Sequence, residues 1–138
     1  MKEIRINLHG TQLPVAHGDW VDLYTKECVQ LKKGEFKIIS LGVSMELPAG
    51  YYALVVPRSS TPKNHKIFLA NSIGIIDNAY NGDDDVWGFP AYAFEDTIIP
   101  AGTRIAQFTL VKQSEPIVFN VVESLGNSNR GGFGSTGK

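Results

Sequence analysis

Leu41-Gly42-Val43-Ser44-Met45-Glu46-Leu47 is followed at once by Pro48-Ala49-Gly50 and then by Tyr51-Tyr52-Ala53-Leu54-Val55-Val56, which Pro57 closes. The first stretch alternates apolar residues with small or polar ones, the period of a half-buried β-strand. The Pro-Ala-Gly triplet interrupts that period as a turn. The second stretch is β-branched and aromatic, a composition typical of strands. The sequence therefore predicts two strands joined by a short turn.

The same signal recurs in both directions along the chain. Residues 4–8 alternate isoleucine and leucine with polar residues, and further strand-like runs occupy residues 73–76, 86–94, 103–111 and 116–122. Glycine, proline and asparagine separate them. Only the region around residues 61–69 has the composition of a short helix. Many short strands in one chain predict an all-β fold, a sandwich or jelly roll.

Composition limits the classes of function. A chain of 138 residues with 43% hydrophobic and 20% charged residues fits one globular domain. The net charge of −1 argues against extensive nucleic-acid contact. No apolar run is long enough to span a membrane, and the N-terminus lacks the apolar core of a signal peptide. Cys28 stands alone, so we expect no intrachain disulfide and a cytoplasmic location.

The metal-binding residues are few and scattered. His9, His17 and His65 lack ligand-like spacing, and no Cys-x-x-Cys pair occurs, so a zinc site is not expected. Any metal should be a hard cation held by carboxylates, phosphates and water.

The C-terminal segment, residues 126–138, reads Gly-Asn-Ser-Asn-Arg-Gly-Gly-Phe-Gly-Ser-Thr-Gly-Lys. Such a glycine content is typical of a flexible linker, which is one interpretation. A linker needs neither the lone Arg130 nor the lone Phe133. Arg130 offers a planar fork for phosphate oxygens and Phe133 a flat apolar face. The second interpretation is an arm that closes over a phosphorylated ligand with a flat ring.

Four further segments have compositions that packing alone does not explain. Residues 18–23 present carboxylates, and residues 57–60 present a guanidinium with two hydroxyls. Residues 71–82 have the composition of a hairpin that carries an acid, and residues 104–107 that of a strand with polar donors. Each segment taken singly is more often structural than functional.

In this order and with the tail, the segments resemble the five motifs of the trimeric deoxyuridine triphosphatase (dUTPase) family. The resemblance runs from Gly18 to Gly137, and its most specific parts are the hairpin with Asp77 and Tyr80 and the glycine-rich tail. Asn81 stands where the family usually has arginine, and such departures resemble a phage or prophage-type branch.

The resemblance implies a jelly-roll protomer over residues 1–122 and a C-terminal arm over residues 123–138 that closes over a neighbouring subunit's active site. It also implies a homotrimer that hydrolyses dUTP to dUMP and pyrophosphate with Mg²⁺. That activity keeps uracil out of DNA and supplies dUMP for dTMP synthesis.

The resemblance also implies roles for the residues around the nucleoside. Asp77 corresponds to the aspartate that activates water. The uracil would meet the hairpin at Asn71, Gly74 and Ile76, with Tyr80 beneath the deoxyribose. Phe133 would stack on the uracil, although Trp87 is an alternative lid because it follows the hairpin closely. Trp87, Phe89 and Tyr92 are otherwise expected in the core.

The expected phosphate contacts are Arg58, Ser59, Ser60, Gln107, Arg130, Gly134, Ser135 and Thr136. Arg104 belongs to the same constellation, partly as a structural ion pair. Asp22 is expected to hold metal-bound water, and Mg²⁺ would otherwise be held by the substrate phosphates.

Two rival functions remain open on the sequence. A dCTP deaminase of the same fold also uses an Arg-Ser-Ser turn, although it needs a glutamate base that the hairpin lacks. A dUTPase-like regulatory module that binds a protein partner is the rival from another class.

Overall fold

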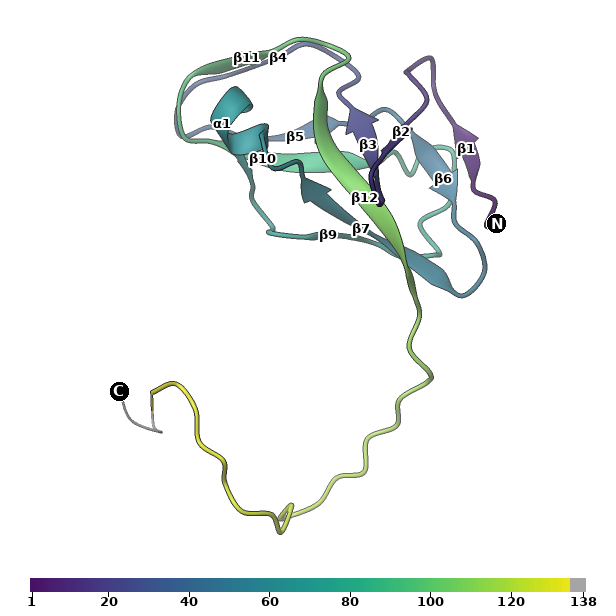
Figure 1. Cartoon of the computed structure of the whole chain (residues 1–138), viewed down its shortest axis with the longest axis vertical. Helices are drawn as coiled ribbons and strands as arrows, with labels where there is room; N and C mark the ends of the chain where they lie inside the picture. Colours follow the sequence, from purple (N-terminus) through teal and green to yellow (C-terminus); the bar gives the residue numbers. More distant parts are fainter. Residues whose placement is uncertain (135–138) are drawn as a thin grey trace.

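The computed structural model describes residues 1–134, and nearly all of its regular structure is β-strand (Figure 1). The elements in chain order are β1 (Arg5–Asn7), β2 (Val15–His17), β3 (Trp20–Tyr24), β4 (Val29–Leu31), β5 (Phe36–Ser40), β6 (Ser44–Glu46), β7 (Tyr51–Pro57), α1 (Thr61–His65), β8 (Ile67–Leu69), β9 (Gly74–Ile76), β10 (Gly88–Ala93), β11 (Thr97–Ile99) and β12 (Arg104–Lys112).

The strands form two main sheets. The larger sheet has the order β2-β3-β12-β7-β9, the smaller has the order β5-β10-β8, and β1-β6 and β11-β4 form separate pairs. Every pairing is antiparallel, with connections that cross between sheets. This arrangement is a jelly roll, which confirms the expected all-β fold.

The core lies between the sheets. Leu23, Val55 and Phe108 fill it from the larger sheet, and Phe89 from the smaller. Trp87 is 1% exposed and meets Phe108 edge-on, with ring centroids 5.1 Å apart. Burial of each such side chain stabilises the fold by about 1.5–3 kcal/mol. Trp87 and Phe89 therefore lie in the core as expected.

The only described helix is shorter than the predicted segment. It covers Thr61–His65, begins with proline in its first turn, and ends where Lys66 adopts a left-handed backbone with φ 59°. That conformation stops a helix. Residues 67–69, which were included in the helical prediction, form β8 instead because Ile67 and Leu69 alternate into the core.

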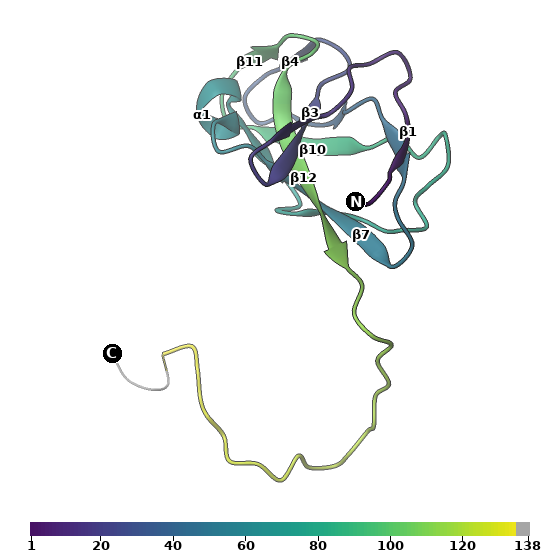
Figure 2. The same cartoon turned by 45° about the vertical axis from the view of Figure 1, so that its right-hand side comes forward.

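The predicted strand over residues 116–122 was wrong for the single chain. The last described strand ends at Lys112, and the Gln113 N–H then donates to the Gly50 carbonyl over 2.8 Å. The following residues to 134 are all exposed and extend away from the body (Figures 1 and 2). Alternating apolar residues predict a strand without saying which chain supplies the partner.

Tyr92 was also placed wrongly, because it lies outside the core. It is 43% exposed and is paired across the smaller sheet with Phe36 on one side and Phe68 on the other. Ile38 shares this face through its pairing with Pro90. We call Phe36, Ile38, Phe68 and Tyr92 the outer apolar face. Among the described residues no helix is long and apolar enough to cross a membrane.

Candidate active site

The expected site residues fall into two groups at opposite ends of β7. The first group, at the Pro57 end, contains Asp22, Arg58, Arg104 and Gln107. The second group, at the Tyr51 end, is the hairpin that carries Asp77. The strand between them fixes their separation.

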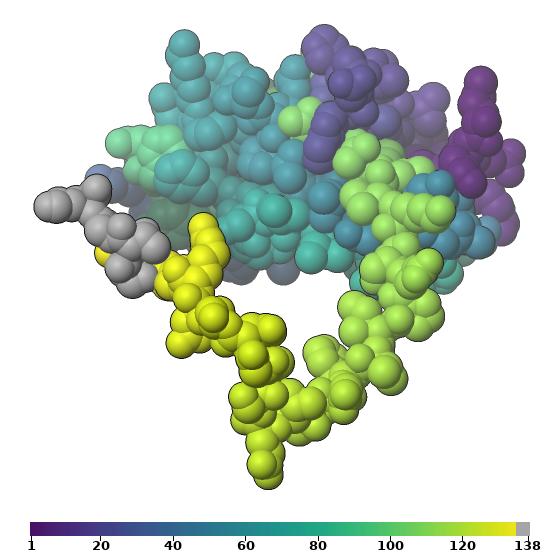
Figure 3. All heavy atoms as spheres, turned by 60° about the horizontal axis from the view of Figure 1, so that its bottom comes forward, coloured from purple at the N-terminus to yellow at the C-terminus, as the bar shows by residue number. Residues whose placement is uncertain are grey.

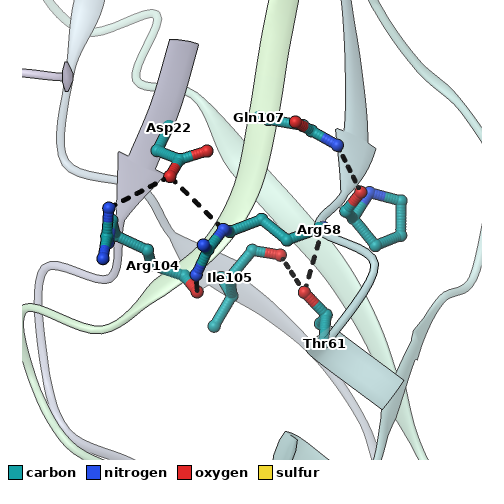
Figure 4. A network of polar contacts seen from close by, with 7 residues as sticks. Asp22, Arg58, Thr61, Arg104, Ile105 and Gln107 are labelled. Atoms are coloured by element: carbon teal, nitrogen blue, oxygen red, sulfur yellow. Dashed lines mark hydrogen bonds and ion pairs between the residues drawn. The ribbon is translucent and has the colours of Figure 1, made fainter. Parts of the chain in front are cut away.

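Asp22 is the centre of the first group (Figure 4). Its side chain is 1% exposed. Its Oδ2 accepts a hydrogen bond from Arg104 Nη1 and forms an ion pair with Arg58 Nε, each over 3.3 Å. Asp22 lies on β3 directly opposite Gln107 on β12, so the sheet ladder places these side chains together. One buried carboxylate against two guanidinium groups leaves a net positive charge. This corner of the molecule can therefore bind an anion.

The Arg58-Ser59-Ser60 turn continues directly from β7. Pro57 has no N–H to donate and so ends the strand ladder. Ser59 is exposed and Ser60 is half-buried at the start of α1. Burial, and to a smaller extent the nearby Arg58 guanidinium, lower the pKa of His65 below its ordinary value.

Gln107 completes the first group. Its side chain is half-buried, and its Nε2 donates to the Pro57 carbonyl over 3.2 Å. The structure thus brings the predicted site residues Arg58, Arg104 and Gln107 together. Thr61 was not among the predicted site residues. Its buried hydroxyl accepts a hydrogen bond from the Arg58 N–H and donates one to the Ile105 carbonyl, next to this group. The only signal was a hydroxyl residue next to the Arg-Ser-Ser turn.

The second group is built on β9, which pairs with β7 through Gly74↔Val55 and Ile76↔Ala53. A Cβ atom at position 74 would lie 3.2 Å from the Val55 Cβ and 3.4 Å from its carbonyl oxygen. A side chain at this position would therefore crowd Val55, and glycine lets β9 approach β7 closely. Asn71 is exposed on the turn before β9, and Ile76 is half-buried at the end of the strand.

Asp77 follows β9 and is exposed. The Tyr80 N–H donates to the Asp77 carbonyl over 3.0 Å, and the amide of Asn78 donates to the carbonyls of Pro48 and Tyr51. These bonds hold the aspartate turn against the start of β7. Asp77 lies in an open depression of about 660 Å³ whose other lining residues are Tyr52, Ile75, Asn78, Ala79, Gln113 and Ser114.

Tyr80 lies on the same turn and is 40% exposed. Its hydroxyl donates to the Val86 carbonyl over 3.3 Å, and the Gly82 N–H donates to the Asp85 carboxylate over 2.9 Å. The ring is thus tethered at its hydroxyl while much of its surface remains open. This arrangement suits a ring that packs against a ligand.

The two groups lie too far apart to act together within one chain. Asp77 directly follows Ile76, the last residue of β9, which pairs with Ala53 near the start of β7. Arg58 lies just beyond the other end of β7. From position 52 to position 58 a strand advances roughly 20 Å at about 3.3 Å per residue. A general base must lie within hydrogen-bond reach of the water that it activates. One copy alone therefore cannot apply Asp77 and the Arg58 turn to the same atom.

The described part of the arm, residues 123–134, joins neither group. Arg130, Phe133 and Gly134 are exposed, and in the space-filling view the arm stands clear of the body for most of its length (Figure 3). The expected contacts Ser135 and Thr136 lie outside the described residues.

Comparisons with known proteins point in one direction. A family model described as dUTPase matches residues 20–137. The chain is 55% identical over 120 residues to the SPbeta prophage-derived deoxyuridine 5′-triphosphate nucleotidohydrolase YosS of Bacillus subtilis. That alignment covers 87% of this chain and 84% of the relative.

Solved structures share the fold. A mutant of the Staphylococcus bacteriophage 80alpha dUTPase, solved with dUpNHpp, has a TM-score of 0.81 at 23% identity, with 99% of each chain covered. A mutant dUTPase of phage phi11 of S. aureus has a TM-score of 0.77 at 19% identity. The alignment covers 89% of this chain and 98% of that chain, whose structure describes a structural Mg(II) ion.

Proposed function

The chain belongs to the dUTPase family and hydrolyses dUTP to dUMP and pyrophosphate, and we propose that it does so in active sites shared by three copies. Removal of dUTP keeps uracil out of DNA, and the dUMP formed is available for dTMP synthesis. The proposal about assembly and residue roles rests on the geometry described above.

A shared site is proposed because the Asp77 hairpin and the Arg58 group lie at opposite ends of β7. If the Asp77 hairpin of one copy faces the Asp22–Arg58–Arg104–Gln107 group of the next, both groups can reach one nucleotide. Such a head-to-tail contact closes into a ring when its rotation matches the number of copies. Three copies then form three equivalent sites.

The outer apolar face supports assembly. Its four side chains are between 43% and 61% exposed in the single chain, and they lie together on one sheet surface. Contiguous apolar surface of this kind marks an interface more often than it remains in water. We propose that this face packs against another copy in the trimer.

Tyr92→Glu tests this interface. A charge placed among Phe36, Ile38 and Phe68 must be desolvated on assembly, so the variant is expected to elute as a monomer and to lose dUTP hydrolysis. Light scattering after size-exclusion chromatography measures the mass. Ile98→Glu is the matched control, since Ile98 is 65% exposed on β11, a strand that pairs with β4 and not with the smaller sheet. A trimeric Tyr92→Glu protein would contradict the proposed interface.

The exposed segment that follows β12 supports the proposal that a third copy contributes to each active site. Residues 116–122 carry exposed apolar side chains and pair with no strand within residues 1–134, and among them Ile117 is 73% and Phe119 90% exposed. We propose that this segment docks on a neighbouring copy, which would make residue 122 the limit of the folded domain. Residues 123–138 then close over the neighbour's site, with Arg130 at the γ-phosphate and Gly134, Ser135 and Thr136 near the other phosphates.

The chemistry follows from these positions. The Asp77 carboxylate accepts a proton from a water, or orients it, as the water oxygen attacks the α-phosphorus in line. A new P–O bond forms on the α-phosphorus, the bond to the α–β bridging oxygen breaks, and pyrophosphate leaves. Arg58, Arg104, Gln107 and the Ser59 and Ser60 hydroxyls stabilise charge on the phosphate oxygens.

Magnesium fits this site mainly through the substrate. Asp22 carries two arginines and is almost fully buried, and no group of three acidic, histidine or cysteine side chains in residues 1–134 could hold a metal. We propose that Mg²⁺, when bound, neutralises the triphosphate and takes its direct ligands from it. Asp22 would then act through water at most, and chiefly by holding Arg58 and Arg104.

Base selection is proposed to come from β9. Backbone groups at Gly74 and Ile76, with the Asn71 amide, can match the donors and acceptors of uracil, whereas cytosine would leave buried groups unpaired. A release assay for pyrophosphate with dUTP, dCTP, dTTP and UTP tests the function. Release from dUTP alone is expected, and ammonia release from dCTP would point to the deaminase instead.

Phe133→Ala tests the lid. Because Trp87 is buried in the core, Phe133 is the expected ring over uracil. Loss of stacking worth about 0.5–1.5 kcal/mol should lower kcat/KM for dUTP, while Phe133→Tyr keeps the ring and should retain activity. Steady-state kinetics on both variants decides it. Unchanged constants in the alanine variant would show that another group closes the site.

A regulatory protein partner is a second proposal. Residues 123–134 of the arm are exposed in the single chain, so their order can change when nucleotide binds, and a partner could recognise one of the two states. A pull-down with and without a non-hydrolysable dUTP analogue tests this role. Equal capture in both conditions would exclude nucleotide control.

A further inference from the structure

A β-bulge lies beside the Arg58 turn. The pairing of β12 with β3 shifts register between Arg104 and Ala106, so Ile105 is an extra residue on β12. The ladder between β12 and β7 also stops here, at Ala106↔Pro57. Beyond it, the Arg58 N–H reaches the Ile105 carbonyl only at 3.4 Å. The two strands therefore need another connection at this point.

Thr61 supplies that connection through its side chain (Figure 4). Its hydroxyl donates to the Ile105 carbonyl over 2.7 Å and accepts from the Arg58 N–H over 3.0 Å. The Thr61 N–H donates in turn to the Arg58 carbonyl, also over 3.0 Å. Thr61 is 1% exposed, so water does not compete for these bonds.

The bonds fix the whole turn between Arg58 and Thr61. Both backbone polar groups of Arg58 are held, and its side chain then reaches Asp22 through Nε and the Arg104 carbonyl through Nη1 at 3.4 Å. Ser59 and Ser60, which lie between the two anchored residues, cannot rotate independently of β12. The backbone position of both serines is therefore set by bonds that Thr61 makes with Arg58 and Ile105.

We propose that Thr61 is a positioning residue for dUTP hydrolysis, whose hydroxyl holds the Arg58-Ser59-Ser60 turn in register with Arg104 and Gln107 so that all of them meet the same phosphates. This inference rests on the proposed function. It predicts that removing one hydroxyl weakens the handling of phosphates more than it weakens the fold.

Thr25 offers a matched control within the same chain. It is also 1% exposed, and its hydroxyl donates to the Pro100 carbonyl and accepts from the Thr103 N–H, each over 3.0 Å. The chemistry of this bridge is the same, but it joins the 100–103 turn and does not hold the Arg58 turn. A general effect of losing a buried hydroxyl should therefore appear equally at both positions.

The experiment compares Thr61→Val, Thr61→Ser and Thr25→Val with the unmodified trimer. Thr61→Val is expected to lower kcat/KM for dUTP at least ten-fold at temperatures well below its Tm. Thr61→Ser, which keeps the hydroxyl, should stay within three-fold of the unmodified protein. The Tm of Thr25→Val should fall by a similar amount to that of Thr61→Val, whereas its kcat/KM should stay unchanged. The inhibition constant of deoxyuridine, a competitor of dUTP that has no phosphate, should change less than two-fold in all three variants.

Equal kcat/KM in Thr61→Val and Thr25→Val would overturn the proposal, as would failure of Thr61→Ser to restore activity. If Thr61→Val does not yield folded trimer, Thr61→Ala is compared with Thr25→Ala by the same readouts. Absence of dUTP hydrolysis in the unmodified protein would instead refute the proposed function. The two failures are therefore distinguishable.

Discussion

Asp77→Asn is expected to lower dUTP turnover about 10²- to 10⁴-fold, the usual contribution of a general base, while dUTP binding stays within several-fold. The amide has nearly the shape of the carboxylate but cannot accept the proton from water. The turn itself is held by the Tyr80 N–H and by Asn78, neither of which uses the Asp77 side chain. Single-turnover kinetics and calorimetric titration with dUTP measure the two effects separately.

Asp84→Asn is the control for this change. Asp84 is an exposed acid in the same loop, seven positions further along, so its substitution removes the same charge. Turnover by this variant should remain near normal. Near-normal turnover by Asp77→Asn would remove Asp77 from the mechanism.

Mixing two inactive proteins is expected to restore activity. One variant is truncated after Leu125 and keeps Asp77 but lacks Arg130 and Phe133. The other carries Asp77→Asn with an intact arm. Because hairpin and arm are proposed to come from different copies, some sites in mixed trimers combine a good hairpin with a good arm. Random assortment gives about a quarter of all sites this combination.

The mixture should therefore recover about a quarter of normal turnover after co-refolding in equal amounts. Native mass spectrometry establishes that mixed trimers have formed, and each variant refolded alone is the control. Mixed trimers without recovered turnover would place hairpin and arm of a site on the same chain. That outcome would overturn the shared-site architecture.

The fold could be predicted from alternation wherever the partner strand lies in the same chain. The stretch from residue 41 to residue 57 predicts two strands, and β6 and β7 lie there. Alternation failed at residues 116–122, since the single chain offers them no partner. It also failed for Tyr92, because an aromatic residue in a strand has the same pattern whether its face is covered by its own core or left open.

The sequence identifies candidate site residues but does not show how they are arranged along the fold. Arg58 and Asp77 are both identified by their motifs, and nothing in their spacing shows that they lie at opposite ends of one strand. That fact depends on the pairing of Ala53 with Ile76. Thr61 was missed for a related reason, because the bulge at Ile105 that gives its hydroxyl a role arises from the register between distant segments.

If the active site is shared between copies as proposed, the span of β7 between Asp77 and Arg58 makes catalysis dependent on the amount of protein present. A lone copy would then have no complete site. Below the concentration at which trimers dissociate, the rate should fall with the third power of chain concentration rather than in proportion to it. A cell that makes little of this protein would therefore have almost no dUTP-hydrolysing activity until the protein concentration allows trimers to form. Above that concentration the activity would rise steeply.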